Sequence, residues 1–321
     1  MSLDRLSVLR DMPKELTHWI LAERAFAGLD ANCPLQGIID KHHDLYLAGA
    51  VLPDTLMHLF HGPQAPTALA LAKRFHDTGT NSYAPFIRAE EHFPDGFPTN
   101  LLACLLGIIA HMQADIVFHP YVYSLSGVAD IGRHYRLETA LDVYFMRRDV
   151  SLPARHLRDL VRPGTRDDLV TACSLIFDPS GELPSEIVGH TLDLHCRFQQ
   201  LYDRTHWKLL VRLLGSLHAP PFKDYQHLFY PLRMTRDDGL LTGHEQWQHP
   251  ITGELLTTSI DQLSSQVVRR TTTVMERIAE HGSLTKALTE PPGENLLTGM
   301  YGVKASQMVG AHEKQGKDQV D

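Results

Sequence analysis

The sequence predicts an all-α protein built from many helices. Apolar residues recur at helical spacing along most of the chain, and the alternating polar and apolar runs that indicate strands are absent. Proline and glycine stand near the ends of the periodic segments, where helices begin and stop. The chain has 321 residues, which is enough for one large domain or two modest ones.

The periodic segments give the order of the expected helices. We expect helices in residues 13–29, 42–62 with a break at Pro53, 66–78, 101–119, 132–149, 166–177, 185–217 and 255–282. The Pro/Gly-rich residues 219–254 predict a long ordered loop, and the polar residues 311–321 predict a disordered tail. We expect residues 1–150 to form a helical core around a metal site, and residues 151–310 to continue it, packed on the same domain.

Composition favours a metal-binding protein. Histidine, the commonest metal ligand, occurs twenty times, more often than packing requires. The net charge of −8 argues against a nucleic-acid partner, because phosphate backbones are bound by basic surfaces. The scattered cysteines predict a reduced protein without a disulfide framework; they are Cys33, Cys104, Cys173 and Cys196. The N-terminus lacks a secretory pattern, and the apolar run "NLLACLLGIIA" is too short to span a bilayer, so we expect a cytoplasmic location.

The segment "GIIAHMQADIVFHP" places three metal-capable side chains in an apolar helix. His111, Asp115 and His119 are four residues apart and share one helical face. The two histidines are separated by roughly 12 Å of helix rise, too far for a single ion. The spacing therefore predicts two neighbouring metals, with His111 and Asp115 on one and His119 on the next. Pro120 should end or kink the helix there. The alternative is a core helix whose polar residues are satisfied by packing partners.

Other candidate ligands surround this helix in the sequence. His134 and Glu138 repeat the four-residue spacing, and with His119 they would make a three-ligand zinc site with an open fourth position. Asp142, one turn further on, is the substitute for Glu138. His76, at a helix end, could complete the first site.

Two further residues come from the first third of the chain. Asp54 follows a proline turn that can direct its carboxylate into a cleft, and His18 lies on the inward face of the first predicted helix. His58 and His61 are alternatives to His76. For the later histidines, His190, His195 and His206, surface or core positions are expected. The stretch "WQHPITGE" predicts either a wall of the substrate cleft or a structural corner.

Five segments together resemble the zinc-dependent phospholipase C family, particularly the catalytic domain of glycosylphosphatidylinositol-specific phospholipase D, and more loosely the P1-type nucleases. They are "THWILAERA", "AGAVLPD", "FHDT", "GIIAHMQADIVFH" and "HYRLETALD". The resemblance implies a compact helical domain with two or three Zn²⁺ ions that hydrolyses phosphate esters. Carried over by position, it implies these metal-site residues: His18, Asp54, His76, His111, Asp115, His119, His134 and Glu138.

The expected function is hydrolysis of a phosphodiester, a phospholipid among the options, by a metal-activated water that attacks phosphorus. Asp54 is either a metal ligand or the base that takes the proton from water. Two alternatives are a phosphohydrolase of the HD type, using "HHD" at 42–44 and "HD" at 76–77, and a non-catalytic protein in which zinc holds the helices together. The sequence leaves open the oligomeric state and whether cleavage is of the C or the D type.

Overall fold

Helices make up nearly all of the regular structure in the computed structural model, which describes residues 15–148, 154, 156–217, 222–232, 240–241 and 246–309. The α-helices are α1 (Glu15–Ala27), α2 (Pro34–Lys41), α3 (His43–Gly49), α4 (Ala65–His76), α5 (Ala84–Glu90), α6 (Thr99–Ser126), α7 (Ile131–Met146), α8 (Leu157–Leu160), α9 (Pro163–Phe177), α10 (Ser185–Leu201), α11 (Thr205–Ser216), α12 (Phe222–Tyr225), α13 (Ile260–His281) and α14 (Leu284–Leu288). The 3-10 helices are η2 (Leu52–His58), η3 (Gln226–Leu228) and η4 (Ala305–Gln307), and the strands are β1 (Trp247–Gln248) and β2 (Leu255–Leu256). The all-α prediction is confirmed.

Several predicted boundaries need adjustment. The first helix begins at Glu15, and Pro13, the expected start, lies outside the described residues, as does the expected tail 311–321. The break at Pro53 is present, but the segment after it is a 3-10 helix. Residues 185–217 form two helices, α10 and α11. The predicted loop 219–254 contains the short helices α12 and η3, together with β1, which pairs antiparallel with β2.

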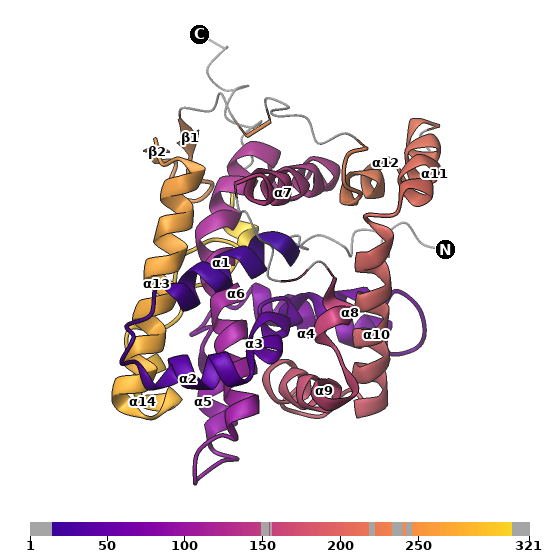
Figure 1. The fold of residues 1–321 in the computed structure, drawn as a ribbon. Helices are drawn as coiled ribbons and strands as arrows, with labels where there is room; N and C mark the ends of the chain where they lie inside the picture. Colours follow the sequence, from indigo (N-terminus) through magenta and orange to yellow (C-terminus); the bar gives the residue numbers. More distant parts are fainter. Residues whose placement is uncertain are drawn as a thin grey trace.

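The long helix α6 runs through the middle of the fold, with α1, α3 and α7 around it (Figure 1). The sequence predicted that Pro120 would end or kink the helix; α6 does not end there but continues to Ser126. Proline lacks the N–H that would bond to the Ile116 carbonyl. Gly299 packs on that carbonyl so closely that a Cβ at this glycine would stand 2.6 Å from the oxygen.

Helix α6 also corrects the expectation that its apolar run is too short to span a bilayer. Its 28 residues, with a mean hydropathy of 1.9 in the most apolar window, meet the length and composition of a membrane span. However, 94% of that window is buried inside the protein. Among the described residues, α6 therefore has the surroundings of a core helix, and it is the only helix that meets these two criteria.

Helices α3 and α6 are in backbone contact at the centre of the fold. A Cβ at Gly107 of α6 would stand 2.0 Å from the Tyr46 carbonyl oxygen, and one at Gly49 of α3 would stand 2.2 Å from the Cys104 carbonyl oxygen. Only glycine permits two helices to approach so closely at these positions. The contact fixes the height of α6 relative to the segment that follows α3.

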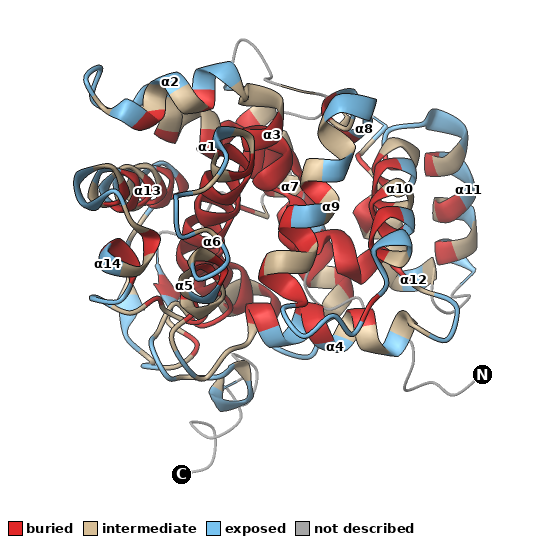
Figure 2. Ribbon diagram, turned by 90° about the horizontal axis from the view of Figure 1, so that it is seen from below, coloured by how far each residue is buried: buried red, intermediate tan, exposed pale blue. Residues whose placement is uncertain are grey.

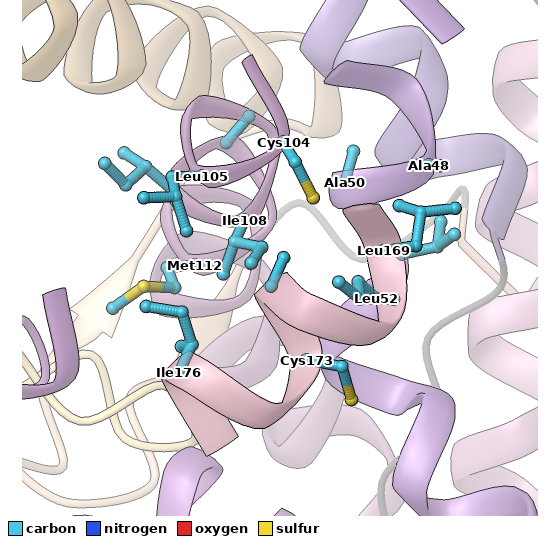
Figure 3. Packing of buried hydrophobic residues seen from close by; sticks show 14 of the residues in the cluster. Ala48, Ala50, Leu52, Cys104, Leu105, Ile108, Met112, Leu169, Cys173 and Ile176 are labelled. Atoms are coloured by element: carbon cyan, nitrogen blue, oxygen red, sulfur yellow. The ribbon is translucent and has the colours of Figure 1, made fainter. Parts of the chain in front are cut away.

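One large hydrophobic cluster draws side chains from the first to the last described helices. Figure 3 shows part of it, where Ile108 and Met112 of α6 approach Ile176 of α9. Buried residues concentrate along α6 and the faces of α9 and α10 that turn toward it (Figure 2). Helices α9 and α13 pack directly on α6, so the later part of the chain contributes to the walls around the polar stripe of α6.

Candidate metal centre

The predicted stripe of α6 lies in the interior of the protein. His111, Asp115 and His119 are all at least 98% buried, on a helix that is otherwise apolar for most of its length. Burying three such groups is costly unless they find polar or ionic partners. The partners come from α1, η2, α4 and α7, and they assemble with the stripe into three groups of potential metal ligands.

The first group joins Asp54, His76 and His111, whose nearest ligand atoms all lie within 4.8 Å of one another. Asp54 stands at the start of η2 behind Pro53, and His76 ends α4. The Nε2 atom of His76 lies 3.3 Å from Oδ1 of Asp54, and the Nε2 atom of His111 lies 4.0 Å from the same oxygen.

The second group joins His18, His111 and Asp115 under the same distance limit. The Nε2 atom of His18 is 3.5 Å from one oxygen of Asp115, and the Nε2 atom of His111 is 3.1 Å from the other. The rings of His18 and His111 are stacked with centroids 4.1 Å apart. Because His111 belongs to both groups and His76 is 3.9 Å from Asp115, the two groups are contiguous.

The third group joins His119, His134 and Glu138, again with ligand atoms within 4.8 Å. The side chain of Asp130 accepts a hydrogen bond from the Arg133 amide and so caps α7, and His134 and Glu138 lie one turn apart on that helix. Their Nε2 and Oε1 atoms are 2.8 Å apart.

Asp142, the predicted substitute for Glu138, is used elsewhere. One of its oxygens accepts hydrogen bonds from the amide and hydroxyl of Thr17, at 2.7 and 2.6 Å. Its other oxygen accepts a hydrogen bond from the hydroxyl of Tyr230 at 2.6 Å. Asp142 therefore ties the start of α1 to α7, and the prediction that it could replace Glu138 is wrong.

Backbone carbonyls orient at least one histidine in each of the three groups. The Nδ1 atoms of His76, His111 and His119 lie 2.9 Å from the carbonyl oxygens of Ala72, Ala50 and Leu296, respectively. A carbonyl only accepts, so Nδ1 carries the proton and the lone pair is on Nε2. In His76 and His111, Nε2 lies 3.3 and 3.1 Å from the carboxylates of Asp54 and Asp115, respectively. This is the arrangement in which proteins hold metal-binding imidazoles.

Electrostatics keep negative charge at the first two groups. Burial lowers the pKa of His18 well below its ordinary value, and His111 beside it lowers the pKa further, so His18 is neutral. Burial alone would raise the pKa of Asp115, but the surrounding histidines, His111 foremost, hold it below its usual range. Burial alone would lower the pKa of His76, yet the Asp54 and Asp115 carboxylates raise it to about 9. The two buried carboxylates thus attract a cation, either a proton on His76 or a metal ion.

The geometry of the donor atoms fits zinc. With bonds of 2.0–2.2 Å in a tetrahedron, two ligand atoms on one zinc stand about 3.3 Å apart. The pairs His76–Asp54, His18–Asp115 and His111–Asp115 have separations of 3.3, 3.5 and 3.1 Å. A cavity of about 20 Å³, lined in part by His18, Asp115 and residues of the third group, has room for one water-sized sphere.

A second buried polar cluster adjoins the first group and was not predicted. His58, on η2, stacks on His195 of α10 with ring centroids 4.0 Å apart, and both rings are at least 99% buried. His195 Nδ1 pairs with the Thr55 hydroxyl at 3.0 Å, and its Nε2 lies 3.4 Å from a Glu15 oxygen. Burial lowers the pKa of both histidines, so they are neutral.

The remaining histidines named as candidates are not in the three ligand groups. His58 does not replace His76, because its Nδ1 bonds to the Asp54 carbonyl and so supports the loop that carries that aspartate. His61, His190 and His206 are exposed. His195 takes a core position, one of the two expected for the later histidines, but its contacts with His58 and Glu15 were not predicted. A histidine on the buried face of α10 is too weak a signal in the sequence to be told from an ordinary core residue.

Of the residues of the HD alternative, only His76 belongs to a candidate metal group in the described part of the chain; the "HHD" residues 42–44 and Asp77 do not join it. His43 pairs with Glu23 on α1. The Asp77 carboxylate accepts hydrogen bonds from the Asn295 side chain and the Ala305 amide, at 2.8 and 2.9 Å. Asp77 therefore holds the C-terminal segment against α4.

A cleft of about 760 Å³ reaches the third group. His134 and Tyr123 line it from α7 and α6, Lys73 lines it from α4, and Lys304 lines it from the N-cap of η4. Neither lysine has an ion-pair partner among the described residues. The stretch "WQHPITGE" is not part of the cleft lining: His249 accepts hydrogen bonds from the amides of Ile251 and Thr252, so this stretch forms a structural corner.

The fold and the three ligand groups define a helical protein with a buried cluster of candidate metal ligands. The family model described as zinc dependent phospholipase C matches residues 17–175, which include all eight residues of the three groups. The match supports assigning this part of the chain to the zinc-dependent phospholipase C family, an all-α family. No curated protein and no solved structure matches the chain.

Proposed function

We propose that this protein is a zinc-dependent phosphodiester hydrolase of the phospholipase C/D type. The observation that carries the proposal is that His76, His111 and His119 each have Nδ1 held by a carbonyl, which leaves Nε2 for a metal, within groups of buried ligand candidates. When bound, zinc supplies an acidic water and positive charge for the phosphoryl oxygens. The family match supports the same reading.

The residues of the three groups are the proposed ligands of two or three ions. Asp54, His76, His111 and Asp115 would hold one ion, and His119, His134 and Glu138 another. His18, which shares Asp115 with the first ion, is the basis for a third. Asp54 is given two possible roles, ligand or base. If Asp54→Asn loses zinc, Asp54 is a ligand. If the variant keeps its zinc but has no turnover, Asp54 is the base.

The cleft favours a catalytic over a purely structural role for zinc. A structural zinc site is closed by four protein ligands, whereas the third group has three ligand candidates and borders an open space. Among the charged residues that line this space, Lys73, Arg74 and Lys304 outnumber Asp77 and Asp130, and this balance suits an anionic phosphodiester. We therefore propose that the substrate enters beside His134.

The substrate that we propose is a phospholipid, as the family match favours. The likeness to the catalytic domain of glycosylphosphatidylinositol-specific phospholipase D stays a prediction. Product analysis decides between the two cleavage types: a diacylglycerol with a phosphorylated head group marks C-type cleavage, and phosphatidic acid marks D-type cleavage.

A zinc count combined with a chromogenic phosphodiester assay tests the proposal. We expect at least two zinc ions per chain after purification without chelator, and turnover that is lost with chelator and restored by zinc. His119→Ala should lose zinc and turnover together. His190→Ala, which removes an exposed histidine of α10, is the matched control and should keep both. Fewer than one zinc per chain after supplementation, or full metal content without turnover of any diester, would contradict the proposal.

A further inference from the structure

Helix α11 turns a lysine and small or medium-sized residues toward the protein and its leucines toward solvent, the reverse of an ordinary surface helix. Its buried positions are Lys208, Val211 and Gly215, spaced by three and four residues, so they share one face. That face packs on α12 and η3, and a Cβ at Gly215 would stand 2.5 Å from the side chain of Gln226. The packing is close, so the orientation of α11 is fixed by its contacts.

The opposite side of α11 presents leucines to solvent. Leu209, Leu210, Leu213 and Leu217 are 53%, 42%, 59% and 67% exposed, and we call these four residues the leucine face. They make up nearly half of the large hydrophobic residues that are exposed in the described part of the chain. Contiguous exposed apolar surface of this kind marks interaction sites. Figures 1 and 2 place α11 at the periphery, beyond α12.

The charged residues of α11 and its N-cap are all basic. The helix and its N-cap carry Arg204, Lys208 and Arg212, and no acidic residue occurs between 204 and 217. Lys208 is paired with Asp203, which leaves the two arginines uncompensated in the ion pairs of the described residues. This stretch is basic although the whole chain has a net charge of −8. A helix with leucines on one face, basic residues beside them and a tryptophan, here Trp207, matches helices that lie in the surface of an anionic membrane.

A second copy of the chain fits the leucine face less well than an anionic membrane does. Pairing of two leucine faces would bring the arginines of both copies together, without an acidic residue on either helix to compensate them. Four leucines on three turns of one helix are also a small area beside the roughly 800 Å² per partner of a stable interface. An anionic lipid surface instead accepts the leucines in its acyl boundary and neutralises the arginines with its head groups.

We propose that the leucine face docks the protein on an anionic phospholipid surface. The inference rests on the proposed function in that it makes this surface the source of the substrate. Helix α11 packs on α12, and α12 packs on α7, which carries His134 and Glu138. A Cβ at Gly132, two residues before His134, would stand 2.7 Å from Asp224 of α12. Because α11, α12 and α7 pack on one another, docking through α11 would keep the third ligand group at a constant distance from the lipid surface.

Vesicle sedimentation with the zinc-loaded full chain tests the proposal. We expect the protein to pellet with vesicles of phosphatidylcholine and phosphatidylserine at about 3:1, and at least tenfold less with phosphatidylcholine alone. Binding to the mixed vesicles should weaken several-fold when salt rises from about 0.1 to 0.5 M. Leu213→Asp and Leu217→Asp should each lower binding more than tenfold. Both side chains are exposed, so circular dichroism should show an unchanged fold.

The controls separate this inference from the proposed function. Leu255→Asp changes a leucine of similar exposure, 60%, on β2 and should bind vesicles like the unmodified chain. All three variants should hydrolyse a water-soluble diester at the unmodified rate, because that assay reports on the metal centre alone. Equal binding to neutral and anionic vesicles, or unchanged binding by Leu213→Asp, would overturn the proposal. So would a dimer in light scattering that Leu213→Asp abolishes while vesicles are not bound.

Discussion

Gly107→Ala tests whether the α3–α6 contact controls the metal centre. The added Cβ would start 2.0 Å from the Tyr46 carbonyl oxygen and 2.9 Å from the Ala50 amide nitrogen. Ordinary contact needs at least 3.4 Å, so α3 and α6 must separate by up to about 1.4 Å at this point. Both obstacles are backbone atoms of a packed helix, so no side-chain rotation can relieve them.

The separation acts directly on a proposed ligand. His111 follows Gly107 by one helical turn, and its Nδ1 bonds to the Ala50 carbonyl at 2.9 Å. Added to this distance, a shift of about 1 Å breaks the hydrogen bond, because such bonds weaken beyond about 3.2 Å. Overpacking of this kind costs about 1–3 kcal/mol of unfolding free energy. Misplacing a group at the active site by about 1 Å can cost roughly a hundredfold in rate.

Urea unfolding with and without chelator, a zinc count and diester turnover measure these effects. Gly37→Ala is the matched control: this glycine lies in the exposed part of α2, and a Cβ there meets nothing within 4 Å. The control should gain about 0.5–1 kcal/mol from helix propensity and keep its zinc. If Gly107→Ala unfolds at the same urea concentration as the unmodified chain and retains full zinc, the contact does not position His111 and the reasoning is wrong.

Three further predictions concern single carboxylates. Asp115→Asn removes the charge shared by the first two groups, so zinc content and turnover should fall together; retention of both would make Asp115 a packing residue. Glu138→Gln should lower zinc content and turnover more than it lowers the free energy of unfolding. Asp142→Asn disturbs the hydrogen bonds to Thr17 and Tyr230, so it should lower the free energy of unfolding more than zinc content and turnover. If both variants lost the same amount of zinc, the assignment of Glu138 as a ligand and Asp142 as a structural residue would be contradicted. Burial alone would raise the pKa of Glu90, but hydrogen bonds from the start of α14 lower it, so its stabilisation is complete above its ordinary value of 4.5 and is lost as pH falls through the folded-state value. Glu90→Gln should therefore destabilise the chain by about 1 kcal/mol at pH 7 and by less at pH 3, and a loss that is independent of pH would refute the assignment.

Local spacing in the sequence was enough to predict the parts of the site that lie on one helix. His111, Asp115 and His119 on α6, and His134 and Glu138 on α7, meet because residues four apart face the same way in any α-helix. The all-α class follows from the same periodicity. Asp54, His76 and His18 were candidates from their local settings, but only the family resemblance joined all three to one metal site, since no spacing rule connects residues so far apart in the chain.

Tertiary packing decided what periodicity leaves open. Asp142 has the same helical phase as Glu138, yet Thr17 and Tyr230 take both of its oxygens. Helix α6 continues through Pro120, and the distant Gly299 packs on the Ile116 carbonyl that the proline leaves without a helical donor. The outward leucine face of α11 likewise depends on which side its neighbours cover. Spacing along a helix is a property of the local backbone, whereas the direction in which a face points is set by contacts between residues far apart in sequence.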